Sequence, residues 1–232
     1  MLILLTGTSS GIGRGLAERL TANGHTVLGC SRRPAREELA GYRHYEADLT
    51  DASQVKRMFA AIQQEHVHLD ALINNAGTAV MNPFLLTPDS EVARLFEINV
   101  FAMLRCSREA VKLMRHSGHE TPSILNLSTV AVPWSIPGQS VYAASKSAVE
   151  QATRSLSYEL APMNVRVNTI GLPPVRTPLT RSLKPEKVQA LVDRQAIRRL
   201  CTLDDILGPV EFLLSPAARF VTGETLFLGG VA

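Results

Sequence analysis

The stretch Leu2–Gly13, which reads LILLTGTSSGIG, decides the fold. Leu2–Leu5 is an unbroken apolar run, as expected of a central parallel strand that is covered on both faces. The glycine-rich turn Thr6–Gly13 follows it, and Arg14–Ala22 has the pattern of a helix. A turn of this kind lets the backbone approach a pyrophosphate, whose charge then sits at the helix N-terminus. The stretch predicts a dinucleotide-binding unit, although its spacing is Gly-x-x-x-Gly-x-Gly and not the commoner Gly-x-Gly-x-x-Gly.

Strands and helices alternate along the rest of the chain, without an internal repeat or linker. We therefore expect residues 1–232 to form a single NAD(P)-binding α/β domain: a Rossmann-type, doubly wound parallel sheet of about seven strands with helices on both faces. Apolar periodicity and turn residues predict further strands at His25–Cys30, Arg43–Ala47, Asp70–Ile73, Ile124–Thr129, Val165–Ile170 and Glu224–Leu228, and further helices at Asp51–Glu65, Ser90–Arg115, Val141–Leu160 and Asp204–Leu214.

The composition excludes several classes of partner. The net charge of +3 is small and its basic residues are scattered among acidic ones, which argues against nucleic acid. No apolar run approaches the ~20 residues of a spanning helix, and the N-terminus lacks the pattern of a signal peptide, so we expect no membrane association. The three cysteines are odd in number and lack Cys-x-x-Cys spacing, which is typical of reduced thiols in a cytoplasmic protein.

The end of the second strand indicates which dinucleotide is bound. Dinucleotide folds usually carry an acid there, which bonds the adenosine ribose. This chain instead has Ser31-Arg32-Arg33, with no carboxylate and two guanidiniums. Guanidinium suits a phosphate, so the motif favours NADP(H) over NAD(H). The alternative is a solvated basic turn, because Arg36 continues the run.

Four other groups of polar residues are considered as possible binding sites. Asp48-Leu49 ends the third strand, and Asn74-Asn75-Ala76-Gly77 ends the fourth in a way that lets another group approach the backbone. Asn99 is the polar member of an apolar helix and should hydrogen-bond a specific group, with nearby backbone as the alternative partner. His66 and His68 have no cysteine or carboxylate constellation beside them, so we expect surface histidines and no metal site.

The pentapeptide Tyr142-Ala143-Ala144-Ser145-Lys146 carries a possible acid/base pair. A tyrosine and a lysine four residues apart share one face of a helix. An adjacent ammonium favours ionisation of a phenol, whose unaided pKa is about 10. Such a phenol becomes usable as a proton donor or acceptor near neutral pH. Taken alone, the pair is equally typical of a solvated helix face.

Together these segments resemble the classical short-chain dehydrogenase/reductases, and in particular the 3-oxoacyl-acyl-carrier-protein reductases, over essentially the whole chain. Thr6–Gly13, Asn74–Gly77, Asn99, the Ser128-Thr129 strand end and Tyr142–Lys146 match that family in order and spacing. The resemblance implies that Tyr142 is the catalytic acid/base. It implies that Lys146 lowers the pKa of Tyr142 and binds the nicotinamide ribose, while Asn99 holds a water that links Lys146 to solvent.

The resemblance also implies a cofactor site that spans the strand ends. Its pyrophosphate cradle is the glycine turn, its adenosine end lies around Asp48, and its nicotinamide end follows the sixth strand. The full predicted set is Gly7, Ser9, Ser10, Gly11, Ile12, Gly13, Ser31, Arg32, Arg33, Asp48, Leu49, Asn75, Ala76, Gly77, Tyr142, Lys146, Val175 and Thr177.

Two departures from the family pattern matter. The serine that orients the carbonyl usually lies 13 positions before the tyrosine, and that count reaches Thr129, with Ser128 beside it. We favour Thr129 and keep Ser128 as the alternative. The second departure is Leu172-Pro173, where the family has Pro-Gly. The loss of that glycine removes flexible backbone beside the nicotinamide.

The resemblance implies an NADP(H)-dependent oxidoreductase that reduces a ketone to an alcohol. Its substrate is a small carbonyl compound, either bound to an acyl carrier or a secondary-metabolite ketone. The competing hypothesis is a dinucleotide sensor that has lost its chemistry, for which Leu172-Pro173 is the main support. The helices Ser90–Arg115 and Val141–Leu160 resemble the pair through which family members form homodimers and homotetramers.

Overall fold

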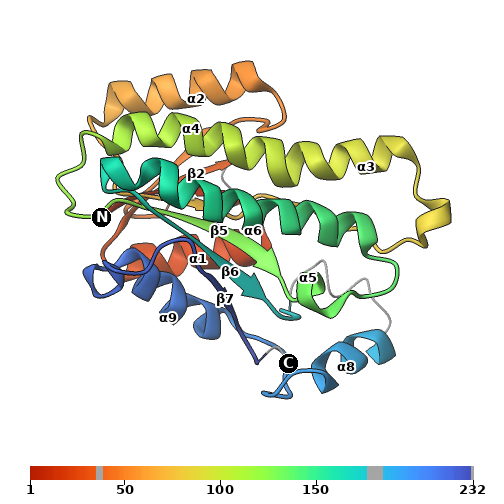
Figure 1. The fold of residues 1–232 in the computed structure, drawn as a ribbon. Coiled ribbons are helices and arrows are strands. Elements are labelled where there is room, and N and C mark those ends of the chain that lie inside the picture. The colour runs from red at the N-terminus through yellow and green to blue at the C-terminus, as the bar shows by residue number, and fades with distance from the viewer. Residues whose placement is uncertain (35–38, 177–184, 231–232) are drawn as a thin grey trace.

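The computed structural model describes residues 1–34, 39–176 and 185–230. Within these residues a seven-stranded parallel sheet has the order β3-β2-β1-β4-β5-β6-β7 (Figure 1). The predicted fold class is confirmed. The strands are β1 Leu2–Thr6, β2 Thr26–Ser31, β3 Tyr42–Glu46, β4 Ala71–Asn74, β5 Ser123–Thr129, β6 Arg166–Leu172 and β7 Thr225–Phe227.

Helices cover both faces of this sheet. Those on one face are α2 Ala52–Glu65, α4 Ala102–Met114 and α6 Ser140–Leu160, and those on the other are α1 Gly11–Ala22 and α9 Leu203–Leu214 (Figure 1). The strand order reverses between β1 and β4. In doubly wound sheets a ligand binds outside the carboxyl ends of the strands at such a switch point.

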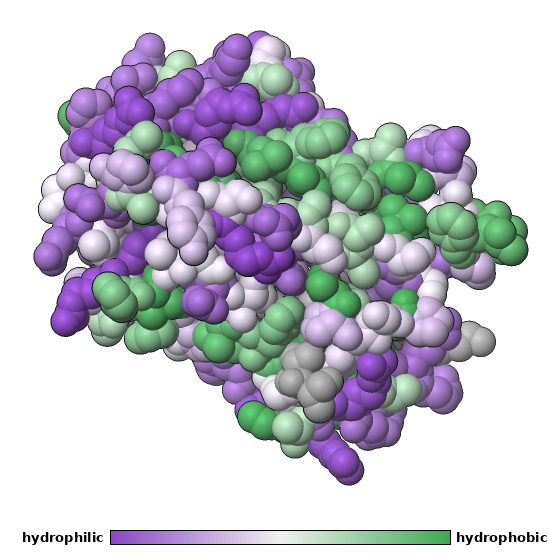
Figure 2. Space-filling view, in the orientation of Figure 1, coloured by the Kyte–Doolittle hydropathy of each residue, from purple (hydrophilic) through white to green (hydrophobic). Residues whose placement is uncertain are grey.

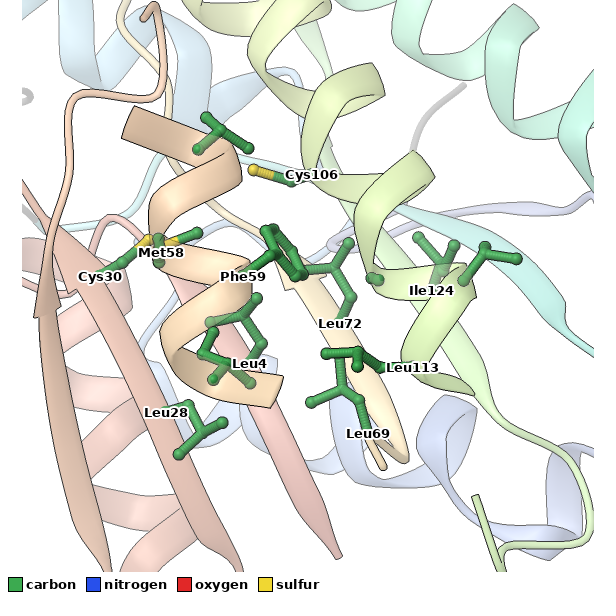
Figure 3. Packing of buried hydrophobic residues seen from close by; sticks show 14 of the residues in the cluster. Leu4, Leu28, Cys30, Met58, Phe59, Leu69, Leu72, Cys106, Leu113 and Ile124 are labelled. Atoms are coloured by element: carbon green, nitrogen blue, oxygen red, sulfur yellow. The ribbon is translucent and has the colours of Figure 1, made fainter. Parts of the chain in front are cut away.

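The central strands are apolar on both sides because each side meets a separate core. Leu4, Leu28 and Leu72 point to one face, where Phe59 of α2 and Leu113 of α4 pack on them (Figure 3). The residues that alternate with them along the strands, such as Ile3 and Leu5, belong to the cluster beneath α1 and α9. Burying each of these side chains contributes about 2 kcal/mol, which fixes the strand register and hence the positions of the strand ends.

The predicted helix Ser90–Arg115 is interrupted. It consists of α3 Asp89–Phe96, a π-helical turn at Glu97–Phe101 and then α4. The π turn contains Asn99, and such turns are frequent at functional sites. Periodicity could not reveal it, because one extra residue in a turn hardly alters an apolar stripe.

Other differences lie mostly at element ends, which shift by one or two residues. A short helix that the sequence did not predict, α5 Ala131–Trp134, follows β5, and α8 Pro185–Asp193 forms part of the segment before α9. The predicted cofactor residue Thr177 lies outside the described residues. Among the helices that are described, none is long and apolar enough to cross a membrane.

Candidate active site

The glycine-rich turn between β1 and α1 depends on glycine for two physical reasons. Gly7 and Gly11 have φ of +76° and +59°, a region that side chains with a Cβ disfavour. Gly13 is needed for space, because a Cβ there would lie 2.3 Å from the carbonyl oxygen of Gly7. The turn is held against β2 by a hydrogen bond from the Gly7 amide to the Cys30 carbonyl, at 2.8 Å. Ser10 is the N-cap of α1, without a side-chain capping bond.

Asn75 fastens the same turn from the β4 side. Its side-chain amide donates to the carbonyl oxygens of Thr6 at 2.7 Å and Gly7 at 3.2 Å. The backbone amides of Asn75 and Ala76 both donate to the Thr6 hydroxyl, at 3.0 and 2.9 Å. The Asn75 side chain thus shapes the cradle, and its predicted contact with the adenosine ribose stays a prediction.

Lys146 lies in the buried face of α6, with 7% of its surface exposed. Its ammonium donates to the backbone carbonyl of Leu127 in β5, at 2.8 Å. Burial lowers the pKa of Lys146 to about 8, and the Glu150 carboxylate, one helical turn further on, opposes that shift. The protein therefore stabilises the charged form of Lys146 less well than water does.

Tyr142 lies one turn before Lys146, as predicted. Burial raises the pKa of its phenol to about 12, and a hydrogen bond from Thr129 opposes the rise. Desolvation of the phenol outweighs the favourable contribution, which comes from Thr129, and Lys146 donates its bond to Leu127. That Lys146 lowers the pKa of Tyr142 stays a prediction.

The two candidate hydroxyls at the end of β5 face different partners. Ser128 is 4% exposed and donates to Oε1 of Glu150 at 2.5 Å. Thr129 is more exposed; its hydroxyl oxygen accepts from the Ala131 amide at 3.2 Å and bonds Tyr142. Thr129, and not Ser128, is thus the hydroxyl beside the phenol.

Asn99 bonds backbone, as the alternative interpretation held. Its Oδ1 accepts from the Thr78 amide at 2.9 Å, and its Nδ2 donates to the Thr78 carbonyl at 3.0 Å and to the Ser145 hydroxyl at 3.0 Å. Both amide hydrogens are used in this way. That Asn99 holds a water that links Lys146 to solvent stays a prediction. Asn99 instead joins the π turn to the segment after β4 and to α6.

Gly77 lies where these groups converge. A Cβ at this position would lie 2.9 Å from Oδ1 of Asn99 and 3.5 Å from Nζ of Lys146. Only a residue without a Cβ therefore fits at this position between the Asn99 side chain and the Lys146 ammonium.

A cavity of about 350 Å³ lies between the glycine turn, the end of β2 and the strand β3. Its walls are Thr8, Ser9, Arg14, Arg33, Pro34, Tyr42 and His44. Of the two arginines predicted for the 2′-phosphate, Arg33 lines this cavity and Arg32 is not among its walls.

The remaining predicted positions follow β3 and β6. Asp48 accepts from the amide and hydroxyl of Thr50 at Oδ1, at 3.0 and 2.7 Å; Leu49 is buried. Leu172 is the last residue of β6 and pairs with Thr129. The strand therefore continues past its predicted end at Ile170 and stops directly before Pro173. Val175 is buried and forms a bridge with Cys201.

Comparison with known proteins decides the family. Residues 7–230 match the family described as enoyl-(acyl carrier protein) reductase. The chain belongs to the short-chain dehydrogenase/reductases. Carbonyl reductase (NADPH) 2 of Sus scrofa is 29% identical over 97% of this chain and 93% of its own length. The 3-oxoacyl-(acyl-carrier-protein) reductase of Vibrio harveyi is 31% identical over 99% and 96%.

Solved structures agree with this membership. The 3-ketoacyl-(acyl-carrier-protein) reductase of Brucella melitensis, complexed with NADH, superimposes with a TM-score of 0.91 at 27% identity over 99% of this chain and 96% of that one. The aldohexose dehydrogenase of Thermoplasma acidophilum gives a TM-score of 0.89 at 30% identity over 99% and 93%. The protein is therefore an NAD(P)-dependent oxidoreductase of the short-chain dehydrogenase/reductase type.

Sequence reasoning missed five residues that line the cavity: Thr8, Arg14, Pro34, Tyr42 and His44. Arg14 could have been found, because it directly follows the last glycine of the turn. Tyr42 and His44 carried no signal in the sequence: they alternate on a strand, and only the pairing of β3 with β2 brings them to the cavity. The expectation that the protein has no metal site stays a prediction. The described residues contain no group of three or more His, Cys, Asp or Glu that could hold a metal ion.

Proposed function

We propose that this short-chain dehydrogenase/reductase uses NADP(H), as a single domain, to reduce a ketone to an alcohol. The observation that supports it best is the hydrogen bond between Thr129 and the Tyr142 phenol, with Lys146 one turn further along α6 and close to Gly77. This is the carboxyl edge of the sheet, where dinucleotide folds bind their ligands. The glycine turn, which a Cβ at Gly13 would fill, fits a pyrophosphate.

The chemistry assigned to each residue follows from its position. When bound, the nicotinamide supplies a hydride to the carbonyl carbon. Tyr142 donates its phenolic proton to the carbonyl oxygen, and its raised pKa keeps that proton in place at neutral pH. The Thr129 hydroxyl donates a hydrogen bond to the same oxygen and stabilises its developing charge. Lys146, partly desolvated, binds the ribose hydroxyls and stabilises the phenolate that the transfer leaves behind.

The preference for NADP(H) rests on the cavity beside the glycine turn. Arg33 lines it, and so does Arg14, whose Nε also donates to Glu18 at 2.5 Å. Among the described residues that line the cavity there are two guanidiniums and no carboxylate, which suits a 2′-phosphate. The cofactor would then lie between this cavity and Lys146, across the switch point.

We expect Arg33→Ala to weaken NADPH binding about tenfold to a hundredfold, since a charge-assisted hydrogen bond contributes about 1.5–3 kcal/mol. NADH binding should be unchanged. Arg32→Ala is the matched control and should alter neither, because Arg32 does not line the cavity. Fluorescence titration with both nucleotides measures this. A loss of NADPH affinity in Arg32→Ala alone would overturn the assignment.

The substrate class follows from the relatives. A carbonyl reductase and 3-oxoacyl-carrier reductases are similar to this chain over nearly all of its length. We propose a small carbonyl substrate, with acyl-carrier-bound 3-oxoacyl groups as the first candidates and secondary-metabolite ketones as the second. Turnover of NADPH with a 3-oxoacyl thioester, compared with a panel of free ketones, separates them.

We further propose that the protein works in the cytoplasm as a homodimer or homotetramer. Apolar side chains gather over α3, α4 and α6, whereas α2 is polar (Figure 2). Phe101, at the end of the π turn between α3 and α4, is 46% exposed and directly follows Val100, which belongs to the cluster of Val100, Met103 and Val149. We expect Phe101→Arg to convert the assembly to monomers. Sedimentation velocity on both proteins measures this, and a wild-type monomer would contradict the proposal.

A further inference from the structure

Four residues beside the arginine-lined cavity form a continuous chain of hydrogen bonds. The Thr8 hydroxyl contacts the Tyr42 hydroxyl at 2.7 Å, and the Tyr42 hydroxyl contacts Nδ1 of His44 at 2.7 Å. On its other side, Nε2 of His44 contacts the carbonyl oxygen of Arg33 at 2.9 Å. Ser31 donates its hydroxyl to the same carbonyl at 2.7 Å. The chain therefore links the glycine turn to the backbone of the arginine that lines the cavity.

The Arg33 end sets the direction of the chain. A carbonyl can only accept, and the Ser31 hydroxyl, which also lies 3.2 Å from Nε2 of His44, donates to that carbonyl, so we assign the imidazole proton to Nε2 and leave Nδ1 of neutral His44 to accept. The Tyr42 hydroxyl is then the donor to Nδ1. The Thr8 hydroxyl, which also lies 3.4 Å from the Cys30 carbonyl, donates to Tyr42, its shorter contact. In this state the phenolic proton of Tyr42 points at the imidazole and is not available to a ligand in the cavity.

Protonation of His44 would reverse the central bond. An imidazolium donates from both nitrogens, so Nδ1–H would donate to the Tyr42 oxygen. The phenolic proton, which Tyr42 retains, would then be available to donate to an acceptor in the cavity. The proton balance is simple: one proton passes from solvent to Nδ1, and no covalent bond to carbon, oxygen or phosphorus changes.

The charges around His44 make this reversal conditional on an anion. Burial lowers the pKa of His44. The carbonyl of Arg33 and the Glu46 carboxylate of β3 oppose that shift. In the part of the chain that the structure describes, the other titratable or charged groups at this place are the guanidiniums of Arg14 and Arg33, the phenol of Tyr42 and the Cys30 thiol of β2, which affects Tyr42. Without a ligand His44 is thus neutral at pH 7, and a phosphate dianion would favour its protonation.

We propose that His44 and Tyr42 couple recognition of the 2′-phosphate of NADPH to uptake of one proton, with His44 positioning both Arg33 and the Tyr42 hydroxyl. This inference rests on the proposed use of NADP(H). It makes β3, in addition to the basic end of β2, a determinant of cofactor specificity. Affinity for NADPH should rise as the pH falls through the pKa of His44 in the complex, and it should level off below the lower pKa of the free protein.

The test is the affinity ratio of NADPH to NADH between pH 6.5 and 8.5 for wild type, His44→Gln and Tyr42→Phe. This range stays above the second pKa of the phosphate, about 6. For the wild type we expect the ratio to rise about tenfold for each pH unit between the pKa of His44 in the complex and pH 6.5, because burial holds the pKa of His44 in the free protein below this range. Both variants should lose that rise, so that their ratio of NADPH to NADH affinity no longer changes with pH. The pKa of His44, followed by NMR with and without NADP⁺, tests the same point in the unaltered protein.

The outcomes are distinguishable. A wild-type ratio near one at every pH would contradict the proposed use of NADP(H) itself. A high ratio that does not change with pH, or one that changes equally in His44→Gln, would leave that proposal standing and overturn the role of His44. If a variant does not fold, the NMR titration decides: a pKa of His44 that NADP⁺ does not raise overturns the inference.

Discussion

Tyr142→Phe should lower kcat for carbonyl reduction by about a thousandfold, because the variant keeps the ring but cannot give a proton to the oxygen. Positioned acid/base groups contribute about 10²–10⁴ in rate. The raised pKa of Tyr142, about 12, determines how the rate in each direction should depend on pH. The phenol keeps its proton at neutral pH, so reduction by the wild type should be nearly constant from pH 6 to 8. Alcohol oxidation, which needs the phenolate, should increase with pH. Initial rates in both directions test this.

NADPH affinity of Tyr142→Phe is the internal control, and we expect it to stay within about threefold of wild type, since Tyr142 makes no bond to the glycine turn. Retained turnover would remove Tyr142 from the mechanism. A biological role that survives in the inactive variant would instead favour the sensor hypothesis. That hypothesis relied on Leu172-Pro173. Leu172 is the buried end of β6, and Val130 bonds its carbonyl at 3.0 Å, so the pair ends the strand without disrupting it.

The fold could be predicted from sequence because its signals are local and repeated. The apolar run Leu2–Leu5 requires cover on both faces, and the turn after it requires glycine for positive φ and for space at Gly13. Tyr142 and Lys146 share a helix face by spacing alone. These features depend on neighbours a few residues away, which a single sequence displays directly.

The rest depends on contacts between distant segments. Asn75 and Asn99 were assigned to ligands, yet both bond backbone that lies elsewhere in the chain. The choice between Arg32 and Arg33 depends on how the chain turns after β2, and His44 reaches the cavity only through strand pairing. A spacing argument identifies which residues are chemically suitable, but it does not say which of their possible partners is closer.

Ser128 and Thr129 illustrate this limit, because both are chemically suitable and only one contacts Tyr142. The same contact predicts a large effect on catalysis. Thr129→Val keeps the shape of the side chain and removes the hydroxyl beside Tyr142. We expect kcat/KM to fall about 10²–10³-fold, as when a donor to a developing oxyanion is lost. Melting temperature should hardly change, because Thr129 is only partly buried and its hydroxyl bonds few protein groups.

Ser128→Ala is the matched control and should behave in the opposite way. It removes the donor to Glu150, whose side chain is 7% exposed and whose pKa burial already raises. An unsatisfied buried acceptor costs about 1–3 kcal/mol, so the free energy of unfolding should fall by that amount while kcat/KM stays within about threefold. Denaturant unfolding and initial rates on the same two variants separate the roles. If Ser128→Ala lost activity and Thr129→Val kept it, the carbonyl would be oriented by Ser128, and β5 would have to shift by one residue against α6 when the cofactor binds.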